Sequence, residues 1–280
     1  SGVTGVYYLI FSVIGFGLNN GLQALISRRA GQERLKEIGD LFIQSVYISL
    51  FIAIVGIVIT HTVAPLIFKN FTNEIIYQPT IDFLKIRIWG LPFLYLYQMR
   101  NGLLVGTNQS KLLVYGTLAE TISNIILDYG LIFGNFGLPK IGFNGAAYAS
   151  IIAEFIGMSV VFIVISVKGM SERFGLFENV KFNWIITKTI LTQSSPLILQ
   201  YAISIISWEF FFILISHDGS IALDVSQVMR LMFGFFGIFI WAFAATSNTM
   251  VSNIIGQGLH DIVNLLIKKI VALSLGSTLL

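Results

Sequence analysis

Eight long apolar runs constrain the fold of this chain more than any other feature of its sequence. A helix needs about 20 apolar residues to cross the hydrocarbon core of a bilayer. Only 11% of the 280 residues carry a charge and 55% are hydrophobic, whereas a soluble domain carries about 25% charged residues. We therefore expect an all-α polytopic membrane protein with about eight transmembrane helices. The expected spans lie near residues 3–27, 41–68, 84–106, 112–134, 145–167, 185–216, 225–255 and 262–280.

Basic residues between these runs predict how the segments are oriented. Arg28, Arg29, Arg34 and Lys36 follow the first run, and short loops rich in Lys and Arg stay in the cytoplasm. We expect a multi-pass protein of the cell (inner or plasma) membrane with loop 28–40 on the cytoplasmic side. The net charge is only +3 and the basic residues form no continuous patch, so we expect contact with the lipid bilayer and no nucleic-acid partner.

The sequence also repeats itself at a shift of 225 positions. Residues 27–50 and 252–275 share seven identities in 24, where chance gives about two at typical residue frequencies. The shift preserves membrane orientation, which predicts parallel repeats: two six-helix lobes related by a pseudo-twofold axis, in a protein of about 450 residues. We expect this chain to be a fragment of it that lacks the first helix and the last several helices. The expected division is an N-terminal lobe over 1–175 (helices two to six), a cytoplasmic connection over 176–184 and the start of the C-terminal lobe over 185–280 (helices seven to nine).

The stretch from Asn124 to Gly157 holds the polar residues that fit a membrane segment least. Asn124 and Asp128 are four residues apart, so their side chains leave the same helical face. Glu120 lies one further turn back on that face. An ionisable side chain near the bilayer centre costs about 3 kcal/mol on insertion scales and normally faces a protein interior or a water-filled cavity. This spacing therefore predicts a functional site on the helix.

The next apolar run carries a ladder of small residues at four-residue spacing: Gly145, Ala149, Ala153 and Gly157. Such stripes let helix backbones approach closely in lipid, and packing alone is their simplest role. Glu154 lies within the ladder. Like Glu120, it is a candidate for relaying protons or for a structural hydrogen bond.

Three motifs give the chain a resemblance to a known family of transporters: GLQALISRRAGQ, NIILDYGLIFGNFGLPKIGFNGAAYAS and SNIIGQ. With them the chain resembles the multidrug and toxic compound extrusion (MATE) family of the MOP flippase superfamily over essentially its whole length. The family has two six-helix lobes around a central cavity and exports cationic amphiphiles in exchange for Na⁺ or H⁺. The resemblance implies an antiporter for small cationic drugs or toxins, a xenobiotic transporter that works by alternating access, as a monomer and with no cofactor besides the coupling ion.

The resemblance also assigns roles to particular residues. Asn124 and Asp128 match fifth-helix residues that bind the coupling cation in many members, and Ser150 matches a small hydroxyl residue of the sixth helix. Glu209 matches a seventh-helix glutamate tied to cation binding in the C-terminal lobe of some members. No resident metal is implied, only transient Na⁺ at Asp128 and Asn124. Asp128 and Glu209 tend to mark different subfamilies, so the ion and the lobe that binds it stay open.

Acidic, amide and aromatic side chains are the expected lining of the substrate cavity. Trp208 flanks Glu209, and an acid among aromatic rings suits a lipophilic cation. The amide side chains of the first segment either line the cavity or form hydrogen bonds between helices. The expected cavity residues are Asn19, Asn20, Gln23, Trp208, Glu120 and Glu154.

A lipid-linked oligosaccharide flippase of the same superfamily is the main alternative function. It calls for a wide basic cavity that receives pyrophosphate, whereas the expected cavity residues here are amide, acidic and aromatic. An enzyme is not expected, because no Ser-His-Asp set, phosphate-binding glycine loop or His-Glu-x-x-His helix occurs. The chain has no cysteine, which excludes disulfides and cysteine-ligated metals.

Overall fold

The chain folds into helices joined by short turns, which confirms the predicted all-helical class. The computed structural model describes residues 2–71, 74–216 and 220–278. The longer helices are α1 (Gly2–Gly31), α2 (Glu37–Thr62), α5 (Leu91–Gly106), α6 (Leu113–Phe133), α7 (Phe143–Val167), α9 (Trp184–Ser216), α10 (Ser220–Gly256) and α11 (Val263–Thr278). The shorter elements are α3 (Ala64–Phe71), α4 (Glu74–Arg87), α8 (Met170–Phe174) and the 3₁₀ turns η1 (Ile88–Gly90), η2 (Ser110–Leu112) and η3 (His260–Ile262).

Five of the expected spans have the length and apolar composition of membrane-crossing helices within the described residues. They are Tyr7–Gly31, Glu37–Lys69, Phe143–Val167, Trp184–Phe212 and Asp224–Gly256. The other three expected spans are helical but fall outside this group, so their crossing of the membrane stays a prediction.

Each of these three has a physical reason for falling outside. The span expected at 84–106 is the second part of a longer segment, in which η1 separates α4 from α5. Pro92 stands in the first turn of α5, and a proline there cannot donate the hydrogen bond that would continue the preceding helix. Helix α6 carries six polar side chains besides its tyrosines, and α11 is described over 16 residues.

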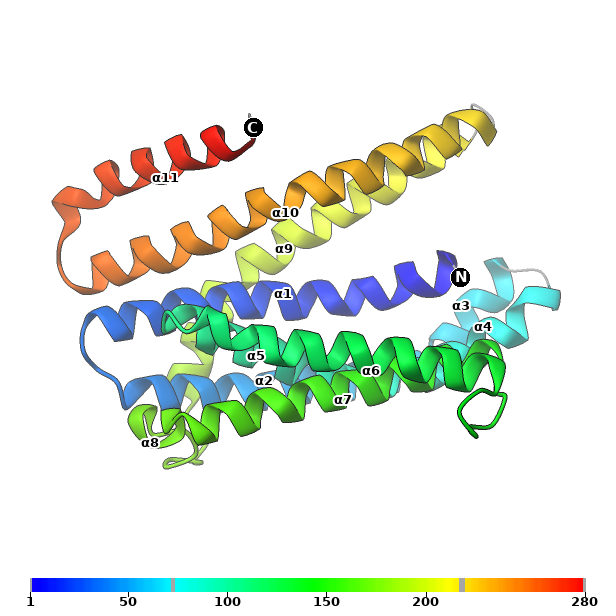
Figure 1. Ribbon diagram of the computed structural model, residues 1–280, viewed down its shortest axis with the longest axis horizontal. Coiled ribbons are helices and arrows are strands. Elements are labelled where there is room, and N and C mark those ends of the chain that lie inside the picture. Colours follow the sequence, from blue (N-terminus) through cyan, green and yellow to red (C-terminus); the bar gives the residue numbers. More distant parts are fainter. Residues whose placement is uncertain (1, 72–73, 217–219, 279–280) are drawn as a thin grey trace.

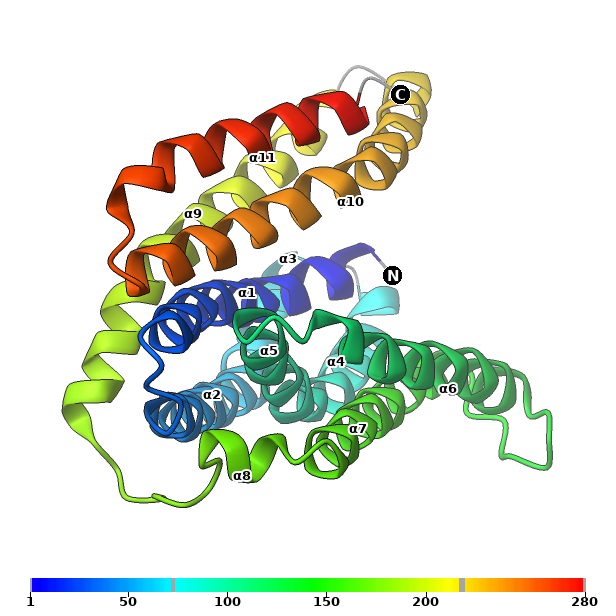
Figure 2. The ribbon, with the colours of Figure 1, turned by 60° about the vertical axis from the view of Figure 1, so that its left-hand side comes forward.

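Helix α1 lies at the centre of the molecule. It packs against α2, α4 and α5, and also against α9 and α10. Figures 1 and 2 place α9, α10 and α11 on one side of α1 and the helices α2 and α4 to α8 on the other. Helices α6 and α7 form a closely packed pair, and α7 also packs on α4 and α5.

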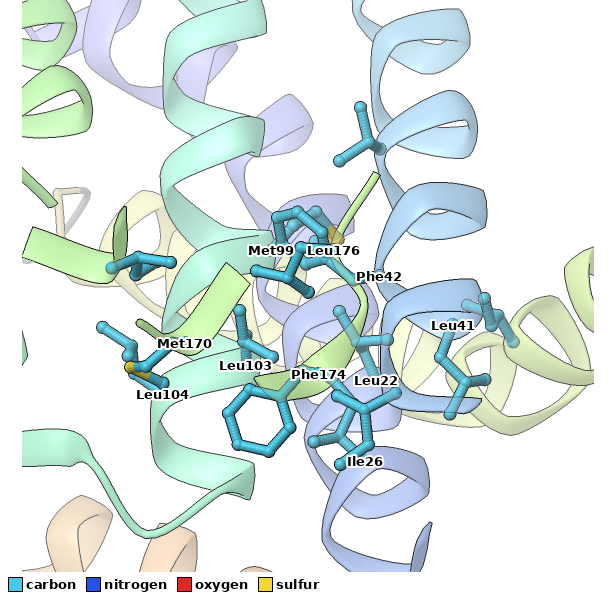
Figure 3. Close-up of a cluster of buried hydrophobic side chains, with 14 of the residues drawn as sticks. Leu22, Ile26, Leu41, Phe42, Met99, Leu103, Leu104, Met170, Phe174 and Leu176 are labelled. Carbon is cyan, nitrogen blue, oxygen red and sulfur yellow. The ribbon is translucent and has the colours of Figure 1, made fainter. Parts of the chain in front are cut away.

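An apolar cluster closes the end of the molecule at which α1 finishes. Figure 3 shows Leu22, Phe42 and Leu103, from α1, α2 and α5, gathered with Met170 and Phe174 of α8. These five side chains are buried. The short helix α8 therefore covers the ends of α1, α2 and α5, and its apolar contacts hold residues 168–176 against these three helices.

The turns that follow α1 and α10 have the same geometry at the predicted shift of 225 residues. Each turn has three consecutive backbone amides that donate hydrogen bonds, and they begin at Gln32 in the first turn and at Gln257 in the second. The first amide donates to the carbonyl four residues earlier, the second to the carbonyl three residues earlier and the third to the carbonyl five residues earlier. The second residue of each turn has a positive φ, 60° at Glu33 and 79° at Gly258. The turn that follows α5 has the same hydrogen bonds and a positive φ at Asn108, so this geometry is a general way for these helices to end.

The contact between α1 and α10 obeys the same shift. The side-chain amide of Gln23 donates to the carbonyl of Ala245 at 2.9 Å. The side-chain amide of Asn248 donates to the carbonyl of Asn20 at 3.2 Å. Adding 225 to Gln23 and Asn20 gives 248 and 245, so each bond is the symmetry mate of the other. Such reciprocity is the mark of a twofold contact.

Two glycines form a second reciprocal pair nearer the ends of the two helices. A Cβ atom on Gly31 would overlap the backbone of Asn253, and a Cβ atom on Gly256 would overlap the backbone of Arg28. From this contact α10 diverges from α1 toward the Gly2 end (Figure 1). We call the contact the α1–α10 clasp. It comprises Asn20, Gln23, Ser27, Arg28, Gly31, Ala245, Asn248, Thr249, Asn253 and Gly256.

Candidate functional site

Two glycines of α7 set the register between α6 and α7. A Cβ atom on Gly157 would lie 2.8 Å from the Cβ of Glu120, and one on Gly145 would lie 2.6 Å from the carbonyl oxygen of Leu131. The helices are antiparallel (Figure 1), so Gly157 lies opposite Glu120 and Gly145 lies opposite Leu131. The small-residue ladder of α7 therefore faces the polar stripe of α6.

The same register places Ala153 opposite Asn124 and Ala149 opposite Asp128. Both alanines are at most 1% exposed. Because small residues let two backbones approach closely, α7 packs closely over this face of α6, on which Glu120, Asn124 and Asp128 are half-buried. The sequence predicts the stripe and the ladder as separate features, and the structure joins them.

A cavity of about 240 Å³ lies where the stripe and the ladder meet. Four of the predicted site residues line it: Glu120, Asn124, Ser150 and Glu154. Asp128 lies one turn beyond Asn124 and is not among the lining residues. We call this space the α6–α7 cavity, which is lined by Arg87, Glu120, Thr121, Asn124, Ile125, Ser150, Ala153 and Glu154.

Asp128 has one carboxylate oxygen, Oδ1, that is buried and has no hydrogen-bond partner among the described residues. A buried carboxylate oxygen without a partner is unfavourable. A proton or a cation bound at this oxygen would remove that cost.

Arg87 is the member of the cavity that sequence reasoning missed. Its guanidinium forms an ion pair with Glu154 in which Nη1 donates to Oε2 at 3.0 Å and Nη2 donates to Oε1. The predicted third span begins at residue 84, which places Arg87 near the membrane surface. In the structure α4 begins at Glu74, so Arg87 lies inside the segment. An Arg in the third predicted span and a Glu in the fifth were the available signal, but spacing alone does not pair them.

Sequence comparison shows which known proteins this chain is similar to. The MatE family profile matches residues 1–130. Over 179 residues the chain is 26% identical to the "Probable multidrug resistance protein NorM" of Synechocystis sp., covering 64% of this chain and 39% of that relative. Over 167 residues it is 30% identical to the "Probable multidrug resistance protein YoeA" of Bacillus subtilis, covering 58% and 35%. The chain is thus similar to MATE proteins over its first half and beyond. It spans less than half the length of these two relatives.

Solved MATE structures share the fold. The chain aligns with a "MATE in the straight conformation" at a TM-score of 0.80 and 17% identity, over 96% of this chain and 60% of that one. It aligns with an outward-facing multidrug resistance MATE transporter at a TM-score of 0.79 and 18% identity, over 93% and 58%. At these identities the likeness concerns the fold alone.

Glu209 and Trp208 lie apart from the α6–α7 cavity. Both are on α9, and α1 separates α9 from α6 and α7 (Figures 1 and 2). Trp208 stacks on Phe212 and meets Phe211 edge to face, and Glu209 is half-buried. Within the described part of the chain, the structure does not bring Glu209 to Asp128.

The amide side chains of α1 lie between helices. Asn20 donates to the hydroxyl of Tyr201 at 3.0 Å, and Gln23 bonds to α10 in the clasp. Asn19 is buried against Gly102, with its Oδ1 unpartnered among the described residues. Of the two roles that the sequence leaves open, Asn20 and Gln23 show hydrogen bonding between helices.

Proposed function

We propose that this chain is part of a cation-coupled multidrug efflux antiporter that exports cationic amphiphilic compounds by alternating access. The polar stripe of α6, covered by the α7 ladder beside a cavity, is the observation that carries the proposal. Ionisable groups inside membrane segments are costly and generally mark ion or substrate pathways. The names of the relatives, as multidrug resistance proteins, support the same function.

Asp128 is the proposed coupling carboxylate, and Asn124 and Ser150 are its proposed neighbours. The unpartnered Oδ1 of Asp128 would accept a proton or contact Na⁺. The amide oxygen of Asn124 and the hydroxyl of Ser150 both line the adjacent cavity. Oxygen donors of this kind suit hard cations. Binding of the ion would give the buried Oδ1 of Asp128 a partner.

The flippase alternative gains no support from this cavity. A pyrophosphate needs cationic side chains with free donors. Arg87 is the one basic residue among those that line the cavity, and two of its nitrogens donate to Glu154.

We further propose that residues 1–175 form the N-terminal lobe and that residues 185–280 begin the C-terminal lobe, with 176–184 as the connection. The α1–α10 clasp is then the contact that parts when the protein reverses its access. Five side-chain hydrogen bonds join the two helices. At about 0.5 to 1.5 kcal/mol net for each, they stabilise the closed contact by about 2.5 to 7.5 kcal/mol. An ion drives the reversal only by binding the two arrangements unequally.

The proposed orientation places loop 28–40 in the cytoplasm of a cell-membrane protein. Four basic residues in that loop support it, under the positive-inside rule. The helices then diverge toward the outside. Trp208 and Glu209 lie along the outer half of α9, where rings and a carboxylate suit a lipophilic cation such as a drug.

Replacing Asp128 by Asn in the intact transporter tests this proposal. The amide keeps the shape of the side chain but cannot take up and release a cation, so ion-dependent efflux should be abolished. The measurement is the resistance of cells to a panel of cationic drugs, with expression checked in each strain. Asp82→Asn is the matched control, because Asp82 accepts a hydrogen bond from Gln78 on the exposed side of α4. Undiminished resistance with Asp128→Asn would sink the assignment.

A further inference from the structure

The Arg87–Glu154 pair has a more constrained geometry than an ordinary ion pair. Only 13% of the Arg87 side chain and 9% of the Glu154 side chain are exposed. The pair runs directly past Gly90 of η1, where a Cβ atom would overlap both side chains. A glycine at the break between α4 and α5 therefore leaves the room in which the two groups meet.

A third helix fixes the guanidinium from its other side. Its Cζ lies 3.9 Å from the centre of the Tyr8 ring, which α1 supplies. A cation over an aromatic face is attracted by the ring, and a guanidinium that forms two parallel hydrogen bonds is oriented as well as bound. Arg87 is thus held between α1 and α7 in one orientation.

Glu120 is the second carboxylate of the α6–α7 cavity, and the ion pairs of the described residues leave it without a partner. The charged groups around it are Glu154 of α7, Arg87 of α4 and Arg100 of α5. Arg100 donates to the backbone carbonyls of Met158 and Leu96 and forms no ion pair with Glu120.

From this arrangement we infer that Arg87 determines which carboxylate of the cavity exchanges a cation. Fixed on Glu154, it neutralises that carboxylate and leaves Glu120 to take up a proton or Na⁺. An unpaired carboxylate in a membrane interior is stabilised when it gains a positive charge. The amide of Asn124, one turn away on the same face, is a second donor for the ion. Arg87 is therefore a positioning residue, and Glu120 is a second exchangeable carboxylate beside Asp128. The inference rests on the proposed function.

The test compares Arg87→Gln, the double variant Arg87→Gln with Glu154→Gln, and Glu120→Gln in the intact transporter. Drug efflux from proteoliposomes is measured while pH and Na⁺ concentration are varied separately. Arg87→Gln removes the positive neighbour, so the midpoint for activation should shift about tenfold or more toward lower cation concentration, the size of effect that a nearby opposite charge has on a carboxyl group. The double variant should bring the midpoint back toward that of the wild type. In Glu120→Gln fewer cations should be exchanged for each drug molecule.

Two outcomes would overturn the inference. One is a Glu120→Gln variant with the wild-type midpoint and stoichiometry. The other is a double variant that stays as far from the wild type as Arg87→Gln. If Arg87→Gln does not fold, the inference is still tested by Glu120→Gln and by the double variant. The double variant buries no unpaired charge of this pair. Asp128→Asn is measured in parallel: if it abolishes coupling while Glu120→Gln changes nothing, this inference fails and the proposed function stands. If Asp128→Asn also changes nothing, the proposed function itself fails.

Discussion

Cross-linking α1 to α10 at the clasp should stop transport completely and reversibly. The side chains of Gln23 and Thr249 meet there, with 2.7 Å between Nε2 and Oγ1. This chain has no cysteine of its own. In an intact transporter freed of any cysteines outside it, the pair Gln23→Cys and Thr249→Cys can be joined selectively by a short bifunctional thiol reagent. If the clasp must part in each cycle, the linked protein is held in one arrangement. Efflux should be lost on linking and return when a cleavable linker is reduced.

A pair within one proposed lobe provides the matched control. Tyr7 and Thr60 meet through their hydroxyl groups at 3.0 Å, between α1 and α2. A lobe that moves as a rigid body tolerates a link there, so Tyr7→Cys with Thr60→Cys should transport equally well before and after linking. Each single-cysteine variant is treated in the same way. Full efflux from a transporter quantitatively linked at the clasp would contradict alternating access through this contact.

Leucine at Gly157 should separate α6 from α7 and abolish transport. A Cβ atom there would already lie 2.8 Å from the Cβ of Glu120 and 3.1 Å from the carbonyl oxygen of Gly116. Overpacking of a close contact typically costs about 1–3 kcal/mol and shifts the backbone. The shift would move the stripe that carries Asn124 and Asp128. Thermal unfolding of the purified variant and its drug efflux are the measurements, with a lower Tm and lost efflux expected.

Ser166→Leu adds the same side chain to an exposed position of α7 and should leave both measurements near those of the wild type. Gly157→Ala is expected to have an intermediate effect, because it adds only the first atom of the clash. A Gly157→Leu variant with the Tm and efflux of the wild type would show that the close approach of the two helices is not needed.

Apolar length predicts most of this fold, because a spanning helix must cover a known thickness of hydrocarbon. The third span shows where that reasoning fails. Asp82 precedes the apolar run, so a span judged by hydropathy starts at residue 84, whereas helix α4 begins at Glu74. The charge of Arg87 is accommodated by Glu154, 67 positions away. A window of about 20 residues cannot contain that partner.

The sequence predicts part of the candidate site, because the spacing of residues along a helix determines which face they share. It does not predict how that helix packs against its neighbour. Four-residue spacing places Asn124 and Asp128 on one face, and the same spacing makes the ladder of α7. Which face of α7 covers the stripe depends on the antiparallel register, which the close contacts of Gly145 and Gly157 set. The α1–α10 bonds of Gln23 likewise depend on tertiary packing, although the 225-residue repeat predicted that the two helices are equivalent.

Drug efflux from proteoliposomes under separately imposed Na⁺ and pH gradients tests the central claim most directly. Wild-type transporter and Asp128→Asn are reconstituted at equal density, and initial rates are measured with each gradient alone. The account predicts that one of the two gradients accelerates efflux by the wild type and that neither accelerates efflux by Asp128→Asn. Acceleration of Asp128→Asn at the wild-type rate by the same gradient would contradict it.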